Sequence, residues 1–517
     1  MHFDPASLAI LDRVNHVIEL LESQSPSRSD GAAYGAANDE RENSTFVESS
    51  EAQRVNDLAI QDELRLESPG FPANINNCES ILRWPVFNDL ALSSVSFVLE
   101  NEREDGQMQS GSVPLSRGIQ EDELQPLSER FLSYVHLLAC ALGSVAVPFN
   151  LSDDWEISSP CAVTRRASRQ DAESYYLAAK KRLGLIESSW LRIQCLFLCG
   201  VFEMYKLQVL RAWEYFYEAC GQLKNLFWKR SLSRQNNDEY QSHHLEQRLY
   251  WSCMKSELEL RCEIPLPPSG MSRLDLSDVL PSPPTDVMLL SPCYDSPSCT
   301  TTSTLVDNDE ERSWFYYLAE ISFRRIMNRA FVLIAADGET SWITDFQRIK
   351  AHHELFQEQI EIWFGLFKSK YSHIPPPIKL NLGAFNNELA HHIDARAISI
   401  SEWIHRPFLY YAIHQPPDDP FMTQAMPLAK KCLDMCVENQ LRMHPHLHHG
   451  TWFMARHSMA RASLLVASVR CGKTQMPENW RKAVNNAFET LRYLANDASD
   501  LERAANSLEA LIDNIDV

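Results

Sequence analysis

Apolar residues recur at intervals of three and four along most of the chain beyond Gln170, and no other feature of the sequence constrains the fold as much. This spacing gathers apolar side chains on one face of an α-helix. Glycine is scarce, with 16 residues in 517, which disfavours a fold of many strands joined by tight turns. The sequence therefore predicts an all-α, multi-helix fold with a disordered polar N-terminal linker and long internal loops.

The helical pattern divides into successive segments. Gly184 is expected to end the first and Pro265 the fourth, because glycine favours helix C-termini and proline cannot continue a helix. Pro281 to Asp309 is rich in Pro, Ser and Thr and is predicted to be a loop. The helices are expected over 172–183, 190–210, 213–230, 241–262, 310–336, 346–367, 386–414, 427–443, 450–471, 478–494 and 499–515.

The N-terminal part differs from the rest. Residues 1–22 contain four apolar positions with the alternating spacing of a coiled-coil seam, so we expect a short, coiled-coil-like dimerisation helix there. It could pair with a second copy or dock onto the same chain. Residues 23–68 are too polar to form a core and are predicted to be a disordered linker, followed by a helical domain over 69–517. The seam consists of Leu11, Val14, Ile18 and Leu21.

The charge of the chain argues against direct contact with nucleic acid. The net charge is −21, from 48 Lys and Arg against 69 Asp and Glu. Such a chain is repelled by phosphate unless its basic residues cluster. The short basic clusters, at 164–169 and around Lys229, are interpreted as solvated helix ends or loops. Taken alone, the chain is expected to bind nucleic acid poorly.

Cysteine usage and hydropathy favour a soluble, intracellular chain with reduced thiols. No Cys-x2-Cys pair occurs among the thirteen cysteines. The pairs Cys195/Cys199 and Cys432/Cys436 each have helical spacing, and we interpret both as core-facing rather than metal-binding. The start has no basic segment followed by an apolar run, so no signal peptide is expected. No apolar stretch reaches the roughly 20 residues that a membrane span needs.

Two polar groupings invite a catalytic or metal-binding hypothesis. Four histidines crowd the bend at 443–450, but no carboxylate or thiol is close in sequence, so we interpret them as incidental or structural. His392 and Asp394 are two residues apart and do not face each other on a helix. No nucleophile elbow or phosphate-binding loop occurs. We therefore predict no catalytic, cofactor-binding or metal residue, and no enzyme. The four histidines are His444, His446, His448 and His449.

The stretch from Ile400 to His414, taken with 248–255 and 265–270, resembles the regulatory middle region of fungal zinc-cluster transcription factors, which carry a binuclear zinc, six-cysteine cluster. The order of the motifs carries the resemblance more than any single one. It covers most of 77–472 and is interrupted after His136, where two family segments are fused directly. Further motifs in that order lie at 81–87, 193–198, 211–213 and 317–322.

The resemblance assigns signature positions to the core or to the wall of a site. We interpret the aromatic ones as core or lining residues and Arg406-Pro407 as a kink within a helix. A buried Arg406 would need a partner such as Glu402, four residues earlier. The signature positions are Trp251, Gly270, Trp403, Arg406, Pro407, Phe408 and Tyr410.

The resemblance implies a transcription regulator acting in the nucleus on RNA polymerase II transcription of metabolic or secondary-metabolite genes. It implies a homodimer, or a heterodimer with related factors, and a possible small-molecule effector. The family binds DNA through its N-terminal zinc cluster, which has no counterpart here. Zinc and DNA contact are thus not expected in this chain alone, nor is a membrane. The alternative is a helical ligand-binding protein or enzyme with no recognisable catalytic motif.

Overall fold

The computed structural model describes residues 77–90, 92, 96–100, 127–146, 162–232, 240–271, 303–335, 337–372, 388–443 and 447–515. Within these segments the regular structure is helical and no strand occurs, which confirms the all-α, multi-helix prediction for this part of the chain. The predicted dimerisation helix, with Leu11, Val14, Ile18 and Leu21, lies outside the described residues, as does the predicted linker.

From Glu388 onward the helices follow one another with short connections. In chain order they are α3 (Cys78–Leu82), η2 (Pro85–Phe87), α5 (Leu127–Val145), α6 (Ala162–Leu183), α7 (Trp190–Tyr205), α8 (Val209–Leu232), α9 (Tyr240–Glu263), α10 (Ser303–Ala330), η5 (Phe331–Ala335), α11 (Glu339–Thr344), α12 (Phe346–Ser372), α13 (Glu388–His414), α14 (Met422–Arg442), α15 (Thr451–Cys471), α16 (Trp480–Ala495) and α17 (Ser499–Asp513).

Several helix ends agree with the sequence, and others do not, such as the start of α6 at Ala162 rather than at residue 172. The first and fourth predicted helices end before Gly184 and Pro265 as expected. The helix predicted over 190–210 begins at Trp190 as expected, but its predicted end is wrong, because α7 ends at Tyr205 and the chain turns into α8 with Leu207 at a φ of 60°. The loop predicted to reach Asp309 is also wrong at its end, since α10 begins at Ser303. Ser, Thr and Asp suit the first turn of a helix as well as a loop.

The turn at Leu207 is a Schellman motif. The Gln208 N–H donates to the Glu203 carbonyl at 2.9 Å, and the Leu207 N–H donates to the Met204 carbonyl at 3.1 Å. These two bonds satisfy carbonyls that the helix end leaves open. Glycine usually occupies the left-handed position of this motif, because a side chain there is strained. Here the position is occupied by Leu207, which has a positive φ although it is not a glycine, and its side chain is buried in the core.

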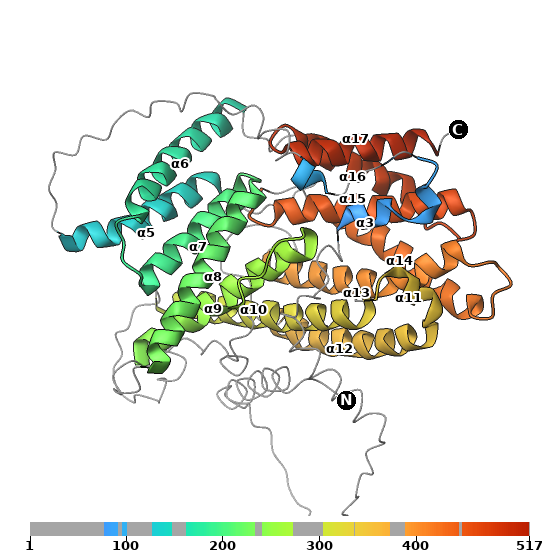
Figure 1. Cartoon of the computed structure of the whole chain (residues 1–517), viewed down its shortest axis with the longest axis horizontal. Helices are drawn as coiled ribbons and strands as arrows, with labels where there is room; N and C mark the ends of the chain where they lie inside the picture. Colours follow the sequence, from blue (N-terminus) through green and yellow to red (C-terminus); the bar gives the residue numbers. More distant parts are fainter. Residues whose placement is uncertain are drawn as a thin grey trace, which may run out of the picture.

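The helices form stacked layers on one side of the molecule and a smaller group on the other (Figure 1). From top to bottom of the view, α17 and α16 cover α15, and α13 lies between them and α12. The short helix α3 packs against α15. At the opposite end, α5 and α6 pack with α7 around a second, smaller core. No helix among the described residues is both long and apolar enough to cross a membrane.

The two stretches on either side of His136, where the sequence predicts a fusion of segments, form one uninterrupted helix. α5 continues through His136, which is exposed, into the small-residue stretch that follows. Leu138 and Ala141 point into the smaller core with Cys195 and Cys199. The prediction that this cysteine pair faces a core is confirmed.

Candidate ligand site

The helix at the centre of the layers, α15, carries a buried arginine. Arg456 is 1% exposed, and its two terminal nitrogens donate to both carboxylate oxygens of Glu79 in α3. Its Nε donates to Glu263 Oε2 at 2.9 Å, at the end of α9. Buried charges are tolerated only when they are paired. This arginine therefore holds three helices in one arrangement.

The Glu263 carboxylate lies between the side chains of Arg456 and His457. Burial alone would raise the pKa of Glu263, but the interactions with His457 and Arg456 outweigh it and lower the pKa below its ordinary value. The Nε2 atom of His457 lies 3.5 Å from Glu263 Oε1. Burial lowers the pKa of His457, which favours a neutral imidazole at pH 7. Glu263 is thus an ionised carboxylate inside the protein.

The signature helix α13 supplies a second ion pair. Glu402 accepts hydrogen bonds from Arg406 Nε at 2.5 Å and from Arg406 Nη2 at 3.2 Å, and both side chains are buried. This confirms the partner predicted four residues before Arg406. The Nε atom of Arg461, on α15, lies 3.8 Å from the same carboxylate. Burial opposes the charge of Arg406, yet Glu402 outweighs it and raises the arginine pKa.

A third ion-pair group joins α9, α10 and α13. Glu259 accepts from Arg324 at 2.7 Å and contacts Arg396 at 3.4 Å. Arg396 and Lys255 also contact Glu320, at 3.2 and 3.3 Å. Burial would raise the pKa of Glu320, but Arg396 and Lys255 lower it to about 2. Glu320 is therefore an ionised carboxylate at neutral pH.

The three ion-pair groups meet at one pocket of about 40 Å³, between α9, α10, α13 and α15. One part of its wall is ionic and contains equal numbers of carboxylates and guanidinium groups. Another part is apolar and mostly aromatic. The ionic residues are Glu259, Glu263, Glu402, Arg324, Arg396 and Arg406, and the apolar residues are Phe323, Met327, Phe331, Trp403 and Phe453, with Cys262, Ser399 and His457 completing the wall.

The structure brings only some of the signature residues to this pocket. Trp403 and Arg406 line it, and the Trp403 ring packs edge-on against Phe331 at 4.4 Å between ring centroids. Pro407 lies inside α13. Because proline has no N–H, the carbonyl of Trp403 lacks its usual helical partner. α13 nevertheless continues to His414.

The other signature residues have packing roles. Phe408 contacts the ring of His353, and Tyr410 packs edge-on against Trp84 at 5.0 Å. Trp251 is buried in α9. Gly270 follows α9 with a φ of +77°, and a Cβ at this position would lie 2.8 Å from Lys224 Nζ. These positions build the core around the pocket.

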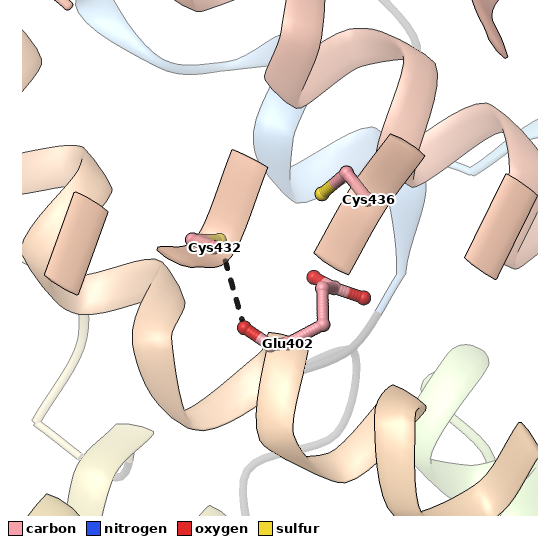
Figure 2. Close-up of side chains that lie close together, drawn as sticks. All are labelled: Glu402, Cys432 and Cys436. Atoms are coloured by element: carbon pink, nitrogen blue, oxygen red, sulfur yellow. Dashed lines mark hydrogen bonds between the residues drawn. The ribbon is translucent and has the colours of Figure 1, made fainter. Parts of the chain in front are cut away.

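The pair of cysteines on α14 lies beside the pocket carboxylate. Among the described residues, Glu402, Cys432 and Cys436 form the one group that could offer three ligand atoms to a metal ion (Figure 2). Cys432 Sγ donates instead to the Glu402 carbonyl at 3.6 Å. The carboxylate itself is engaged by Arg406. A cation there would have to displace a guanidinium, and burial raises the pKa of Cys432 well above its ordinary value. These residues do not fit a metal centre.

The histidine-rich bend is only partly described. His444 and His446 lie outside the described residues. His448 Nδ1 accepts from the Gly450 N–H at 2.9 Å, and the rings of His448 and His392 lie 6.0 Å apart. Burial lowers the pKa of His449 to about 4. The described histidines of the bend thus have structural partners.

Sequence analysis missed most of the ionic wall. Arg324, Arg396 and Glu263 were not singled out, because nothing in helical periodicity distinguishes a buried ion pair from a solvated one. One clue was present on α15, where Arg456 and Arg461 interrupt a run of small and apolar residues. Comparisons of the chain with protein families, curated proteins and solved structures gave no match.

Proposed function

We propose that the chain is the regulatory domain of a transcription regulator, acting in the nucleus on metabolic or secondary-metabolite genes transcribed by RNA polymerase II. The supporting observation is that motifs far apart in the sequence meet in one packed core. Trp84, from the first motif, contacts Tyr410 of the last one. Arg406 of the same last motif lines the pocket. A motif order that corresponds to one connected core supports a shared architecture with zinc-cluster factors.

The proposed mechanism is regulation through contacts between helical proteins, without catalysis. The chain would form a homodimer or pair with a related factor that provides the DNA-binding module. Its net charge of −21 opposes direct phosphate contact. In the heterodimer, the loss of one DNA-binding arm would remove the phosphate contacts of that arm and weaken operator binding.

A tethering experiment tests this function. The full chain would be fused to an unrelated DNA-binding domain whose operator lies upstream of a reporter gene. We expect a several-fold change in reporter expression relative to the DNA-binding domain alone, in either direction. Deleting the gene should alter a defined set of transcripts. A silent reporter together with an unchanged transcriptome under all growth conditions would overturn the proposal.

The mixed wall of the pocket favours one alternative, a helical protein that binds a metabolite without a role in transcription. Pockets that combine apolar surface with a few polar groups are the usual places for small ligands. Incubating the purified chain with metabolite mixtures and measuring whether any metabolite is consumed tests whether the chain is an enzyme. Turnover that is abolished by a single polar substitution would favour an enzyme over a regulator.

A further inference from the structure

We infer that Ser168, near the N-terminal end of α6, is a phosphorylation site for an arginine-directed serine/threonine kinase, and that the phosphate weakens the ion pair between Arg169 and Asp497. The inference does not depend on the proposed role in transcription, because such a kinase selects its substrate by the charge pattern around the serine. It assigns a role to the basic cluster at 164–169, which the proposed function leaves unused.

Two adjacent arginines stand three and two residues before the serine. The sequence is Arg165-Arg166-Ala167-Ser168. Kinases that select basic substrates carry carboxylates in the substrate groove, and these pair with guanidinium groups at such positions. In the whole sequence, two consecutive basic residues followed by one further residue and then a serine or threonine occur only here. The pattern therefore distinguishes Ser168 from the other serines of the chain.

The position of the motif within α6 is compatible with a kinase groove. α6 begins at Ala162 and has no acidic residue in its first turn, whereas the helix dipole favours negative charge at this end. Terminal turns of helices open at low free-energy cost, and opening gives the extended chain that a kinase groove accepts. Among the residues whose side chains are described, the first on α6 in the smaller core is Ala172. Opening as far as Ser168 therefore leaves that core intact.

The residue after the serine connects α6 to the segment between α16 and α17. Arg169 Nη1 and Nη2 donate to the two carboxylate oxygens of Asp497 at 2.6 and 3.0 Å. The hydrogen bonds from Asp497 raise the pKa of Arg169. The two side chains are partly exposed, at 41% and 34%. Because water and ions reach such a pair, another anion nearby can compete for the guanidinium.

A phosphate on Ser168 supplies that anion. The Cα atoms of consecutive residues are about 3.8 Å apart, well within the screening length of about 8 Å at physiological ionic strength. A phosphoserine carries a charge of about −1.5 to −2 at pH 7, which exceeds that of one carboxylate. The phosphate therefore attracts the Arg169 guanidinium and repels Asp497. Phosphorylation loosens the connection between α6 and the segment joining α16 to α17.

The reaction is a phosphoryl transfer from Mg-ATP. Ser168 Oγ forms a bond to the γ-phosphorus, the bond from that phosphorus to the β–γ bridging oxygen breaks, and ADP leaves with the electron pair. The hydroxyl proton passes to the catalytic aspartate of the kinase. All catalytic groups belong to the kinase, so the reaction requires none from this chain.

Phosphorylation of the purified, folded full chain tests the site. The probes are Mg-ATP and the catalytic subunit of the cyclic-AMP-dependent protein kinase, and peptide mass spectrometry locates the phosphate. We expect phosphate on Ser168, and Ser168→Ala should abolish it. The matched control is Ser174→Ala, at an exposed serine on the same helix without arginines two or three residues before it, which should leave the incorporation unchanged. Absence of phosphate on Ser168 in the wild type would overturn the inference.

Arginine variants test how the site is recognised. The double variant Arg165→Gln/Arg166→Gln should slow phosphorylation of Ser168 roughly tenfold or more, because each lost guanidinium removes a charge-assisted contact with the kinase. Arg182→Gln, in the last turn of the same helix, should leave the rate unchanged. Equal rates in the double variant and the wild type would refute recognition through the arginine pair.

Hydrogen exchange tests the effect on the ion pair. Phosphorylation should raise the exchange rates of the amides around Asp497 about two- to fivefold, the range expected for loss of an exposed ion pair. Arg169→Gln should produce the same rise without phosphate, and phosphorylation of that variant should add nothing further. Unchanged exchange after phosphorylation of the wild type, or a further rise in the variant, would overturn the proposed effect.

Discussion

His353 Nε2 lies 3.1 Å from His405 Nε2, inside the contact between α12 and α13. The two rings are nearly perpendicular. His405 Nδ1 lies 2.5 Å from the Ser401 carbonyl, which can only accept, so this nitrogen carries the proton. His405 Nε2 is then an acceptor, and His353 Nε2 donates to it. Burial lowers the pKa of His353 to about 3 and that of His405 to about 4.

This histidine pair predicts a loss of stability in mild acid. Both folded-state pKa values lie below the unfolded value of about 6.5. The unfolded chain therefore takes up protons first, and the stabilisation present above pH 6.5 is lost as the pH falls towards 4. Each histidine should account for about 2 kcal/mol of the free energy of unfolding between pH 7 and pH 5. Urea unfolding at both pH values measures the loss. In His353→Gln the free energy of unfolding should fall by about 2 kcal/mol less between pH 7 and pH 5 than in the wild type. An equal fall in both proteins would contradict the lowered pKa of His353.

Arg456→Met should be strongly destabilising. The substitution leaves the carboxylates of Glu79 and Glu263 buried without their guanidinium partner. Removing one member of a buried pair costs about 3–5 kcal/mol. The matched control is Lys430→Ala, which breaks an exposed pair with Asp434 and should cost less than about 1 kcal/mol. Urea denaturation gives both values, and similar costs for the two variants would show that the Arg456 network is not essential to the fold.

Trp84→Ala tests whether the first motif belongs to the same core as α13. Trp84 is 3% exposed and contacts Tyr410 and His414. Truncating a buried tryptophan should cost about 3–5 kcal/mol and reduce the near-ultraviolet circular dichroism. Trp228 is 62% exposed, so Trp228→Ala should change stability by less than about 0.5 kcal/mol. The prediction fails if Trp84→Ala unfolds at the same urea concentration as the wild type.

Gly270→Ala and Gly221→Ala should have opposite effects. Gly270 has a left-handed φ, and its substitution would push Lys224 away from the Ser269 carbonyl that it contacts at 2.8 Å. We expect a loss of about 1–2 kcal/mol from strain and the lost hydrogen bond. Gly221 lies within α8 with open space around it, so alanine there should stabilise by about 0.5–1 kcal/mol. Thermal unfolding of the two variants gives the signs, and equal signs would contradict the local geometry.

The sequence predicted the helices well because periodicity and helix-ending residues are local. Gly184 and Pro265 lie just beyond the ends of α6 and α9. The ion pair of Arg406 with Glu402 could be predicted from the sequence because the two residues are one helical turn apart. The end of α7 at Tyr205 was missed because the left-handed position that follows it is Leu207 rather than a glycine.

The pocket could not be predicted because its wall comes from four helices. Periodicity identifies the buried face of each helix, but not the helix that this face meets. Arg324 and Glu263 therefore look like ordinary charged residues until α9 and α10 are placed side by side. Arg456 was recognisable as unusual in its apolar helix, but its partners Glu79 and Glu263 were not.

The pairing of Glu79 with Arg456 also sets the order in which the chain can assemble during translation. The two residues are separated by 377 positions. At about 5–20 residues per second, the ribosome would need roughly 20–75 s to make the arginine after the glutamate. Until then the carboxylate has no guanidinium to meet, and α3 cannot take its final place. The first motif therefore cannot pack in its native position until α15 has been synthesised. During that interval the nascent chain depends on other contacts, or on chaperones.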